Sequence, residues 1–458
     1  MIKTSQPLKQ LPCPKASFLL GHSAYFSQDP LQFLCDCAEQ YDGIVPLRLG
    51  FSQSCFLSNP NVIVEVFRER TVFIKNTPGW RAIQTLVGRG LLSSDGDYWV
   101  RQRKLTQPIF HQQRIAAYAD LMVKASERLL HRWQDGSVRD VHQDMMQLTL
   151  EIVVQSLLST DIEGEAAQAI AHALDLGMEW FARQQKQGFL LPPRFPLPST
   201  RRYLAAVSAM DNLIYQLIRQ RRASNIDKGD LLSMLLQVKD ETDGSQMSDR
   251  QLRDELTTLV LAGHDTTANA LAWTWMLLAQ HPQVEAQLHQ ELDNVLQGRS
   301  PTMADIPALP MTQNVIKEAM RLYPPVVLIA RSASEDYVLQ GYKIPKGCIV
   351  MTSPWAMQRS DRYFENPLSF QPQRWQSDLE KTLPKGVYFP FGEGPRICIG
   401  KGFAQMEATL ILATLAQQYQ FRLATEQAIE PFPSITLRPK AGMRMSLRLR
   451  VSSGCGST

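Results

Sequence analysis

The stretch from residue 391 to residue 400, FGEGPRICIG, surrounds one cysteine with three glycines, which permit tight backbone turns. A helical pattern begins at Gly402, so Cys398 lies just before the N-terminus of a helix. Backbone N–H groups and the helix dipole at such a position favour a thiolate over a thiol. A thiolate held on a rigid loop is a good axial ligand for haem iron, and Arg396 could pair with a haem propionate.

A lone cysteine is more often buried and inert, and two other kinds of site use similar residues. The pattern Phe-x-x-Gly-x-Arg-x-Cys-x-Gly needs residue types of a few per cent usage, so a chance match in this chain is on the order of one in ten thousand. A dinucleotide-binding loop is excluded because Ile397 stands where its third glycine is needed. A redox Cys-x-x-Cys pair is excluded because no second cysteine lies near Cys398. The spacing favours iron ligation.

A second polar group, AGHDTT at residues 262–267, interrupts a long apolar tract. Gly263 and two successive threonines are poor helix formers, so the pattern predicts a local opening of the helix that admits a ligand or water. Asp265 and Thr266 place an acid beside an alcohol, and such a pair can pass protons to a bound oxygen species. The plainer interpretation is a threonine that bonds to its own helix or packs.

The helix that carries this group is predicted from its ends. Ser248 and Gln251 fit a capping box at its start, and His281-Pro282 marks its end. At 1.5 Å per residue its length is about 48 Å, enough to cross the molecule, so we expect it to be the central helix. The polar residues near its middle argue against a membrane span, because the bilayer centre penalises them most.

Two pairs of side chains have the spacing of one helical turn. Glu318 and Arg321 share a face of a helix predicted from Thr312 to Tyr323, and Trp99 lies one turn before Arg103. Most such ion pairs are solvated surface pairs of little energetic value. An arginine next to a tryptophan is commonly a cation–π contact.

Together these motifs resemble the cytochrome P450 family, the haem-thiolate monooxygenases, from about Leu11 to Val451. Residues 391–400 match the family's haem-ligating loop, and residues 262–267 resemble its oxygen-activating segment. Glu318-x-x-Arg321 matches the family's Glu-x-x-Arg motif. The segment PQRW at residues 372–375 matches the family's third network residue at Arg374, although the family usually has Glu and Phe where this chain has Gln and Trp.

The resemblance implies a role for each matched residue. Asp265 takes the acid role and Thr266 the alcohol role in proton delivery, while His264, at a variable position, packs or hydrogen-bonds. Glu318, Arg321 and Arg374 form a structural network behind the cysteine loop. The residues expected to contact haem b are Trp99, Arg103, Arg331, Phe391, Arg396, Gly400 and Cys398, the last as the iron ligand. The reaction implied inserts one atom of O2 into a C–H bond, the other atom leaving as water, with two electrons from a partner.

The fold class expected is mainly α with smaller β regions. A hairpin at residues 43–58 and a period-two alternation over residues 443–451 predict strands near both ends of the sequence. The resemblance implies a single haem domain over residues 1–458, with the haem between the long helix and the helix after Cys398. Its β-rich lobe would be mainly residues 40–60, 333–356 and 420–451, and its α-rich lobe mainly 60–330 and 357–420.

The substrate is expected to be apolar and fairly large: a fatty acid, terpenoid or steroid. The segments that form pockets in the family place these residues at the substrate: Trp80, Ile83, Leu86, Phe181, Phe189, Ala262, Val326, Val327, Leu328 and Ile435. Core packing is the alternative for each of them. Arg81 is a candidate for binding a carboxylate. A peroxide-driven peroxygenase and a non-enzymatic haem sensor remain alternative functions.

Composition limits the partners. The 48 basic and 44 acidic residues give a net charge of +4, too balanced for a protein that coats nucleic acid. Seven irregularly spaced cysteines and no signal peptide favour free thiols and a cytoplasmic location. We expect a monomer without a membrane anchor or fused reductase, which takes electrons from a ferredoxin or flavodoxin with its reductase. A basic face comprising Arg101, Arg103, Lys104, Arg114, Lys385 and Lys401 would suit an acidic partner.

Overall fold

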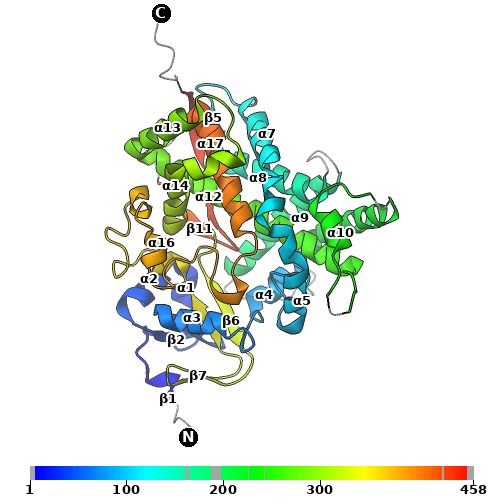
Figure 1. The fold of residues 1–458 in the computed structure, drawn as a ribbon. Helices are drawn as coiled ribbons and strands as arrows, with labels where there is room; N and C mark the ends of the chain where they lie inside the picture. The colour runs from blue at the N-terminus through cyan, green and yellow to red at the C-terminus, as the bar shows by residue number, and fades with distance from the viewer. Residues whose placement is uncertain are drawn as a thin grey trace, which may run out of the picture.

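The computed structural model describes residues 6–159, 165–186, 197–224, 226–241, 243–424 and 428–450. Helices dominate, and the sheets are small, which confirms the expected fold class (Figure 1). The longer helices are α2 Pro30–Gln40, α3 Pro60–Arg68, α4 Pro78–Val87, α5 Gly96–Thr106, α7 Ala119–Leu130, α8 Val141–Leu158, α9 Glu165–Lys186, α10 Pro198–Ser224, α12 Asp249–Gln280, α13 Pro282–Leu296, α14 Pro310–Leu322 and α17 Lys401–Gln418. The shorter ones are α1 Ser23–Gln28, α6 Gln112–Ala116, α11 Leu231–Gln237, α15 Pro354–Met357 and α16 Leu379–Thr382.

The largest sheet has the strand order β2-β3-β9-β6-β4 and lies at the end of the molecule that holds the N-terminus (Figure 1). The predicted hairpin is its first pair, although helices α1 and α2 precede it. A second sheet has the order β1-β8-β7, a third β10-β13-β5, and β11 pairs with β12. The strands are β1 Gln6–Pro7, β2 Ile44–Leu49, β3 Ser52–Leu57, β4 Phe73–Ile74, β5 Val138–Asp140, β6 Ile329–Ala333, β7 Tyr337–Leu339, β8 Tyr342–Ile344, β9 Ile349–Thr352, β10 Tyr419–Leu423, β11 Pro431–Pro433, β12 Leu437–Pro439 and β13 Arg444–Leu449.

Helix α12 is the central element of the helical part. Ser248 and Gln251 form the predicted capping box at its start, and its 32 residues are buried along most of their length. It packs against α8, α10, α14 and α17. Gly263 allows α8 to approach closely, because a Cβ atom there would lie 2.9 Å from Cγ2 of Val153. The helix is continuous through residues 262–267, so the predicted opening is wrong.

The structure gives a physical reason for this continuity. The hydroxyl of Thr266 donates to the carbonyl oxygen of Ala262 at 2.6 Å, and the amide of Asn269 donates to that of Asp265 at 2.7 Å. These side chains bond to carbonyl oxygens of their own helix, and α12 stays helical around them. Most of the Pro-rich stretch at residues 188–200, with Phe189, lies outside the described residues.

Candidate active site

A cavity of about 1930 Å³ lies between the large sheet, α12 and the start of α17. It exceeds the range of about 300–1,000 Å³ that is usual for small-ligand pockets, so it has room for a large group and a second molecule. Asp265 and Thr266 line it from α12, Arg331 from β6, and Phe391 and Cys398 from the loop before α17.

The cysteine loop is a rigid turn. The backbone N–H of Cys398 donates to the carbonyl oxygen of Phe391 at 2.9 Å, and Arg103 donates to that of Ile397 at 3.0 Å. Gly394 has a φ of +71°, and a Cβ atom there would lie 3.0 Å from the carbonyl oxygen of Phe67 on α3. Glycine is therefore required at this position.

Cys398 lines the cavity, as an iron ligand must. Burial raises the pKa of the Cys398 thiol, while the backbone N–H of Gly400 and the Arg103 guanidinium act in the opposite direction. The helix-terminus effect expected from the sequence is thus present, but desolvation outweighs it. A bound metal cation would reverse this balance, because a coordinating thiol is deprotonated.

Arg396 lies beside this loop in a cage of polar and aromatic groups. Its Nη2 atom donates to the carboxylate of Asp95 at 2.5 Å and to the carbonyl oxygen of Ser94 at 2.7 Å. Its guanidinium lies 4.5 Å from the ring centre of Trp99, so Trp99 stacks on Arg396 and not on Arg103. Its Nε and Nη1 atoms are buried and have no partner in the described part of the chain.

Two further buried cations line the same side of the cavity. Arg331 donates weakly to the carbonyl oxygen of Ala330, at 3.3 Å, and burial together with Arg396 lowers its pKa to about 9. Lys75 donates to the carbonyl oxygen of Leu92 at 2.5 Å, and burial, with Arg331 and Arg396 nearby, holds its pKa well below the usual range. Sequence reasoning missed Lys75. The available signal was a charged residue directly after the apolar run at residues 72–74.

This group of cations fits the propionates of a haem. Lys75, Arg103, Arg331 and Arg396 all line the cavity, and Asp95 is the carboxylate that contacts the group. Buried charge needs a partner, and two nitrogen atoms of Arg396, Nε and Nη1, have none among the described residues. A doubly anionic ligand beside Cys398 would provide it. The residues present therefore fit a haem.

The carboxylate of Asp265, the predicted acid, accepts hydrogen bonds from the β11–β12 hairpin. Thr436 and Arg438 both donate to the carboxylate of Asp265, which is almost wholly buried. Burial would raise the pKa of Asp265, but Arg438, His264 and the hydroxyl of Thr436 together hold it below its usual value. Neither Thr436 nor Arg438 belongs to a motif, so no local pattern indicated them.

His264 points away from this chemistry. Its side chain is buried and bonds to the backbone of Met146 on α8, and burial lowers its pKa to about 4. The expectation that it packs or hydrogen-bonds is confirmed.

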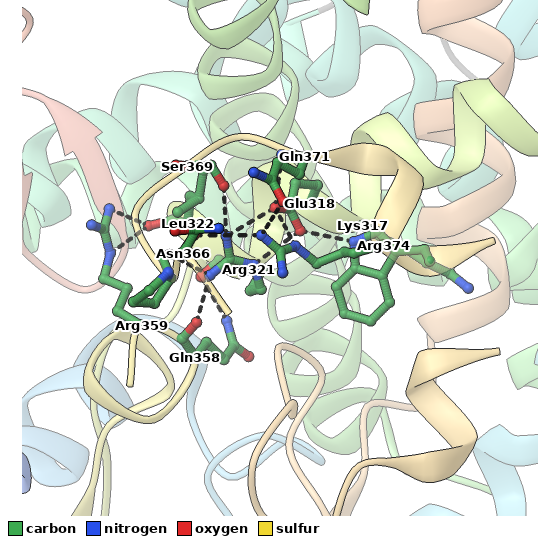
Figure 2. Close-up of polar contacts among 12 residues, drawn as sticks. Lys317, Glu318, Arg321, Leu322, Gln358, Arg359, Asn366, Ser369, Gln371 and Arg374 are labelled. Carbon is green, nitrogen blue, oxygen red and sulfur yellow. Dashed lines mark hydrogen bonds and ion pairs between the residues drawn. The ribbon is translucent and has the colours of Figure 1, made fainter. Parts of the chain in front are cut away.

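The carboxylate of Glu318 is the centre of a dense buried network (Figure 2). Arg321 donates to both of its oxygens, at 2.9 and 2.8 Å, and Arg374 donates to Oε1 at 2.9 Å. The indole N–H of Trp375 donates to Oε2 at 2.9 Å. Trp375 thus adds a hydrogen bond that phenylalanine, usual in the family at this position, cannot make.

This network reaches the segment before the cysteine loop through Gln358, which lies beside Arg321 in Figure 2. Arg321 donates to the carbonyl oxygen of Gln358 at 2.8 Å. The side chain of Gln358 bonds back to the carbonyl oxygen of Arg321 and accepts from the backbone N–H of Phe389, two residues before the loop. The chain of contacts supports a structural role.

Most of the predicted substrate residues line the cavity. These are Trp80, Ile83, Phe181, Ala262, Val326, Val327, Leu328 and Ile435. Leu86 does not line the cavity, contrary to the expectation. Its side chain is 3% exposed and packs in the core near Gly177 of α9, because it lies on a different face of α4 from Trp80. Arg81 is exposed and bonds to Asn76, outside the cavity.

The chain was compared with known proteins. The family model for cytochrome P450 matches residues 11–445. Cyclooctatin synthase of Streptomyces melanosporofaciens is 37% identical over 93% of this chain and 92% of its own. Pentalenene oxygenase of Streptomyces avermitilis is 31% identical, over 95% of this chain and 97% of its own.

A solved structure, the haem domain of cytochrome P450DA, matches with a TM-score of 0.85 at 28% identity, covering 98% of both chains. No helix among the described residues is long and apolar enough to cross a membrane. The match over nearly the whole chain agrees with the cysteine loop, the cation group and the buried network. The chain therefore belongs to the cytochrome P450 family of monooxygenases.

Proposed function

We propose that this chain is a single haem domain in which Cys398 ligates the iron of haem b and Lys75, Arg103, Arg331 and Arg396 hold its propionates. The carrying observation is that Cys398 and these cations line one cavity while N–H groups of Arg396 lack partners in the described chain. Haem, when bound, supplies the oxidising chemistry: activation of O2 and insertion of one oxygen atom into a C–H bond.

The chain's own residues supply protons and exclude water. Asp265 and Thr266 lie next to each other on α12 at the cavity wall, where an acid and an alcohol can transfer protons. The apolar lining orients the substrate and keeps bulk water out. Replacing Thr266 by Ala should divert electrons into hydrogen peroxide. Unchanged product formed per electron pair would contradict this role.

The proposed substrate is an apolar cyclic terpenoid. The two Streptomyces relatives are named for cyclooctatin and for pentalenene. The cavity is lined by Trp80, Phe181, Val327 and other apolar side chains, which suits such molecules. Arg81, the candidate anchor for a fatty-acid carboxylate, does not line the cavity.

Electrons are proposed to come from a ferredoxin or flavodoxin that docks near the cysteine loop. Of the predicted basic face, Lys104, Arg114 and Lys385 are exposed. Arg103 does not belong to this exposed face as expected, because its side chain turns inward and donates to the carbonyl oxygen of Ile397. Arg101 pairs with Asp240, and Lys401 with Glu380. The cytoplasmic location and the monomeric state stay predictions.

The deciding experiment loads the protein with haem and reduces it under carbon monoxide. A thiolate-ligated haem gives a strongly red-shifted absorbance, and Cys398→His should abolish it. A wild-type spectrum typical of histidine ligation would refute the assignment. Cyclic terpenes, with fatty acids of equal carbon number as controls, are then screened for a spectral shift and for uptake of ¹⁸O from ¹⁸O2. Product from hydrogen peroxide but not from electron donors would favour the peroxygenase instead.

A further inference from the structure

The acid on α12 is held by a hairpin far away in the sequence. Strands β11 and β12 flank a tip at residues 434–436, and β12 continues to Arg438. Thr436 donates to one carboxylate oxygen of Asp265, and Nη2 of Arg438 donates to the other. Both oxygens of the acid therefore have their partners on one short segment.

The same hairpin is a wall of the cavity and is fixed to α12. Ser434 and Ile435 at its tip line the cavity. The indole N–H of Trp273 donates to the carbonyl oxygen of Leu437 at 3.0 Å. Substrate contact and support of the acid thus come from neighbouring residues, 434–438, on one element.

Arg438 dominates the charge around the acid. The other titratable groups facing Asp265 are His264 on α12, His142 on α8 and Asp175 on α9. Burial lowers the pKa values of both histidines, so they are neutral near pH 7, and Asp175 is itself acidic. Without Arg438, a buried carboxyl in this setting would favour its protonated form.

We propose that Arg438 and Thr436 are positioning residues for Asp265, so that the hairpin bounding the substrate cavity also sets the proton supply. The inference rests on the proposed function. Held as a carboxylate by these two donors, Asp265 can take up a proton and release it again for the reaction, which leaves it ionised. Arg438 keeps the acid in the form that can accept the next proton.

The test uses the haem-loaded protein and two readouts. Infrared difference spectra of the carboxyl C=O stretch are recorded between about pH 5 and pH 8 for wild type, Arg438→Gln and Arg438→Gln with Asp265→Asn. Arg438→Gln should raise the pKa of Asp265 by about two units and add a band that the double variant lacks. Subtracting the double variant also removes the bands of other buried acids.

The second readout is product formed per electron pair at several pH values. Arg438→Gln should lower this ratio several-fold and shift its pH profile upward, at unchanged haem content. Arg438→Lys should retain most of the wild-type ratio. The matched control is Arg444→Gln, which removes an exposed cation on the neighbouring strand β13 that does not line the cavity. Its pH profile should equal that of wild type.

The proposal is overturned if Asp265 stays ionised in Arg438→Gln and the pH profile does not move. If Arg438→Gln does not fold, Thr436→Val removes the other donor and should give a smaller shift in the same direction; no shift refutes the proposal. Failure of the proposed function looks different, because wild type itself would then form no product. The infrared arm needs no turnover and decides independently.

Discussion

We expect Lys75 to affect the haem-free and the haem-bound protein in opposite directions. Its ammonium group is buried and lies 4.5 Å from the ring centre of Trp80, and Arg331 and Arg396 lower its pKa more than Asp95 raises it. A buried charge without an anionic partner is unfavourable, whereas a charge-assisted bond to a buried anion is strong. At the scale of single residues, Lys75 therefore favours binding of an anionic ligand and lowers the stability of the ligand-free protein.

Replacing Lys75 by Met should stabilise the haem-free protein and weaken haem retention. Loss of one charge-assisted bond, worth about 1.5–3 kcal/mol, corresponds to haem loss faster by about tenfold or more. Thermal unfolding of the haem-free protein and haem transfer to an excess of apomyoglobin measure the two effects. Lys385→Met, an exposed residue, is the control. Unchanged haem transfer would remove Lys75 from the propionate site.

Glu407 gives a second prediction at this scale. Burial raises its pKa to about 8, and the nearby hydroxyl of Thr267 offsets this in part. Between the ordinary and the raised pKa, the folded protein holds a proton that the unfolded chain has released. The free energy of unfolding therefore falls as pH rises through this window, by up to about 1.4 kcal/mol per unit.

Glu407→Gln should remove this contribution, so that its stability relative to wild type increases from about pH 5 to pH 8. Denaturant unfolding at each pH measures the difference. Burial also raises the pKa of Glu255 to about 8, so part of the slope should persist in the variant. The exposed Glu39→Gln serves as a control. Parallel curves for Glu407→Gln and wild type would contradict a raised pKa.

At the scale of elements, the buried network fastens the cysteine loop to α14. Glu318 accepts from two arginines, the backbone of Gln371 and the indole of Trp375, and Arg321 continues to Gln358. A fully satisfied network of this kind rigidifies a core, whereas a partly satisfied one is costly. The segment that leads into the loop is thus supported by residues that do not line the cavity.

Trp375→Phe should destabilise the protein by about 1.5–3 kcal/mol, because it removes a hydrogen bond to a buried charged group. The matched control is Trp275→Phe, since the indole N–H of that buried tryptophan has no partner in the described chain. Thermal unfolding of both variants separates the bond from the packing change. Equal losses would show that the Trp375 bond contributes nothing.

Local patterns were enough to predict α12, α14 and the first hairpin, because caps, prolines and apolar periodicity are written into neighbouring residues. The site residues that were predicted belong to short motifs such as the cysteine loop. Lys75 and Arg438 were missed because their partners lie on other elements, brought together by tertiary packing. Leu86 was misassigned because its segment reaches the cavity but its own helix face does not.

At the scale of the whole molecule, the sheet and the helices have separate cores, and the cavity lies where they meet. Helices α5 and α6 contact the cysteine loop and α17 on one side and carry exposed residues on the other. Arg103 on α5 reaches Ile397 of the cysteine loop, and Ile115 on α6 lies against Gly402 of α17. The exposed cations Lys104 and Arg114 on these two helices therefore lie close to the loop that holds Cys398.

Reversing the charge at Lys104 tests whether this face receives an electron-transfer partner. Lys104→Glu should raise the KM for an acidic ferredoxin and weaken the dependence of reduction on ionic strength, because exposed charges act mainly through encounter. Stopped-flow reduction over a range of salt concentrations measures both. Lys343→Glu on β8 makes the same change of net charge at an exposed position of the β1-β8-β7 sheet instead of α5. It should therefore behave as wild type. If the two variants responded alike, the effect would come from net charge, and α5 would not be the docking surface.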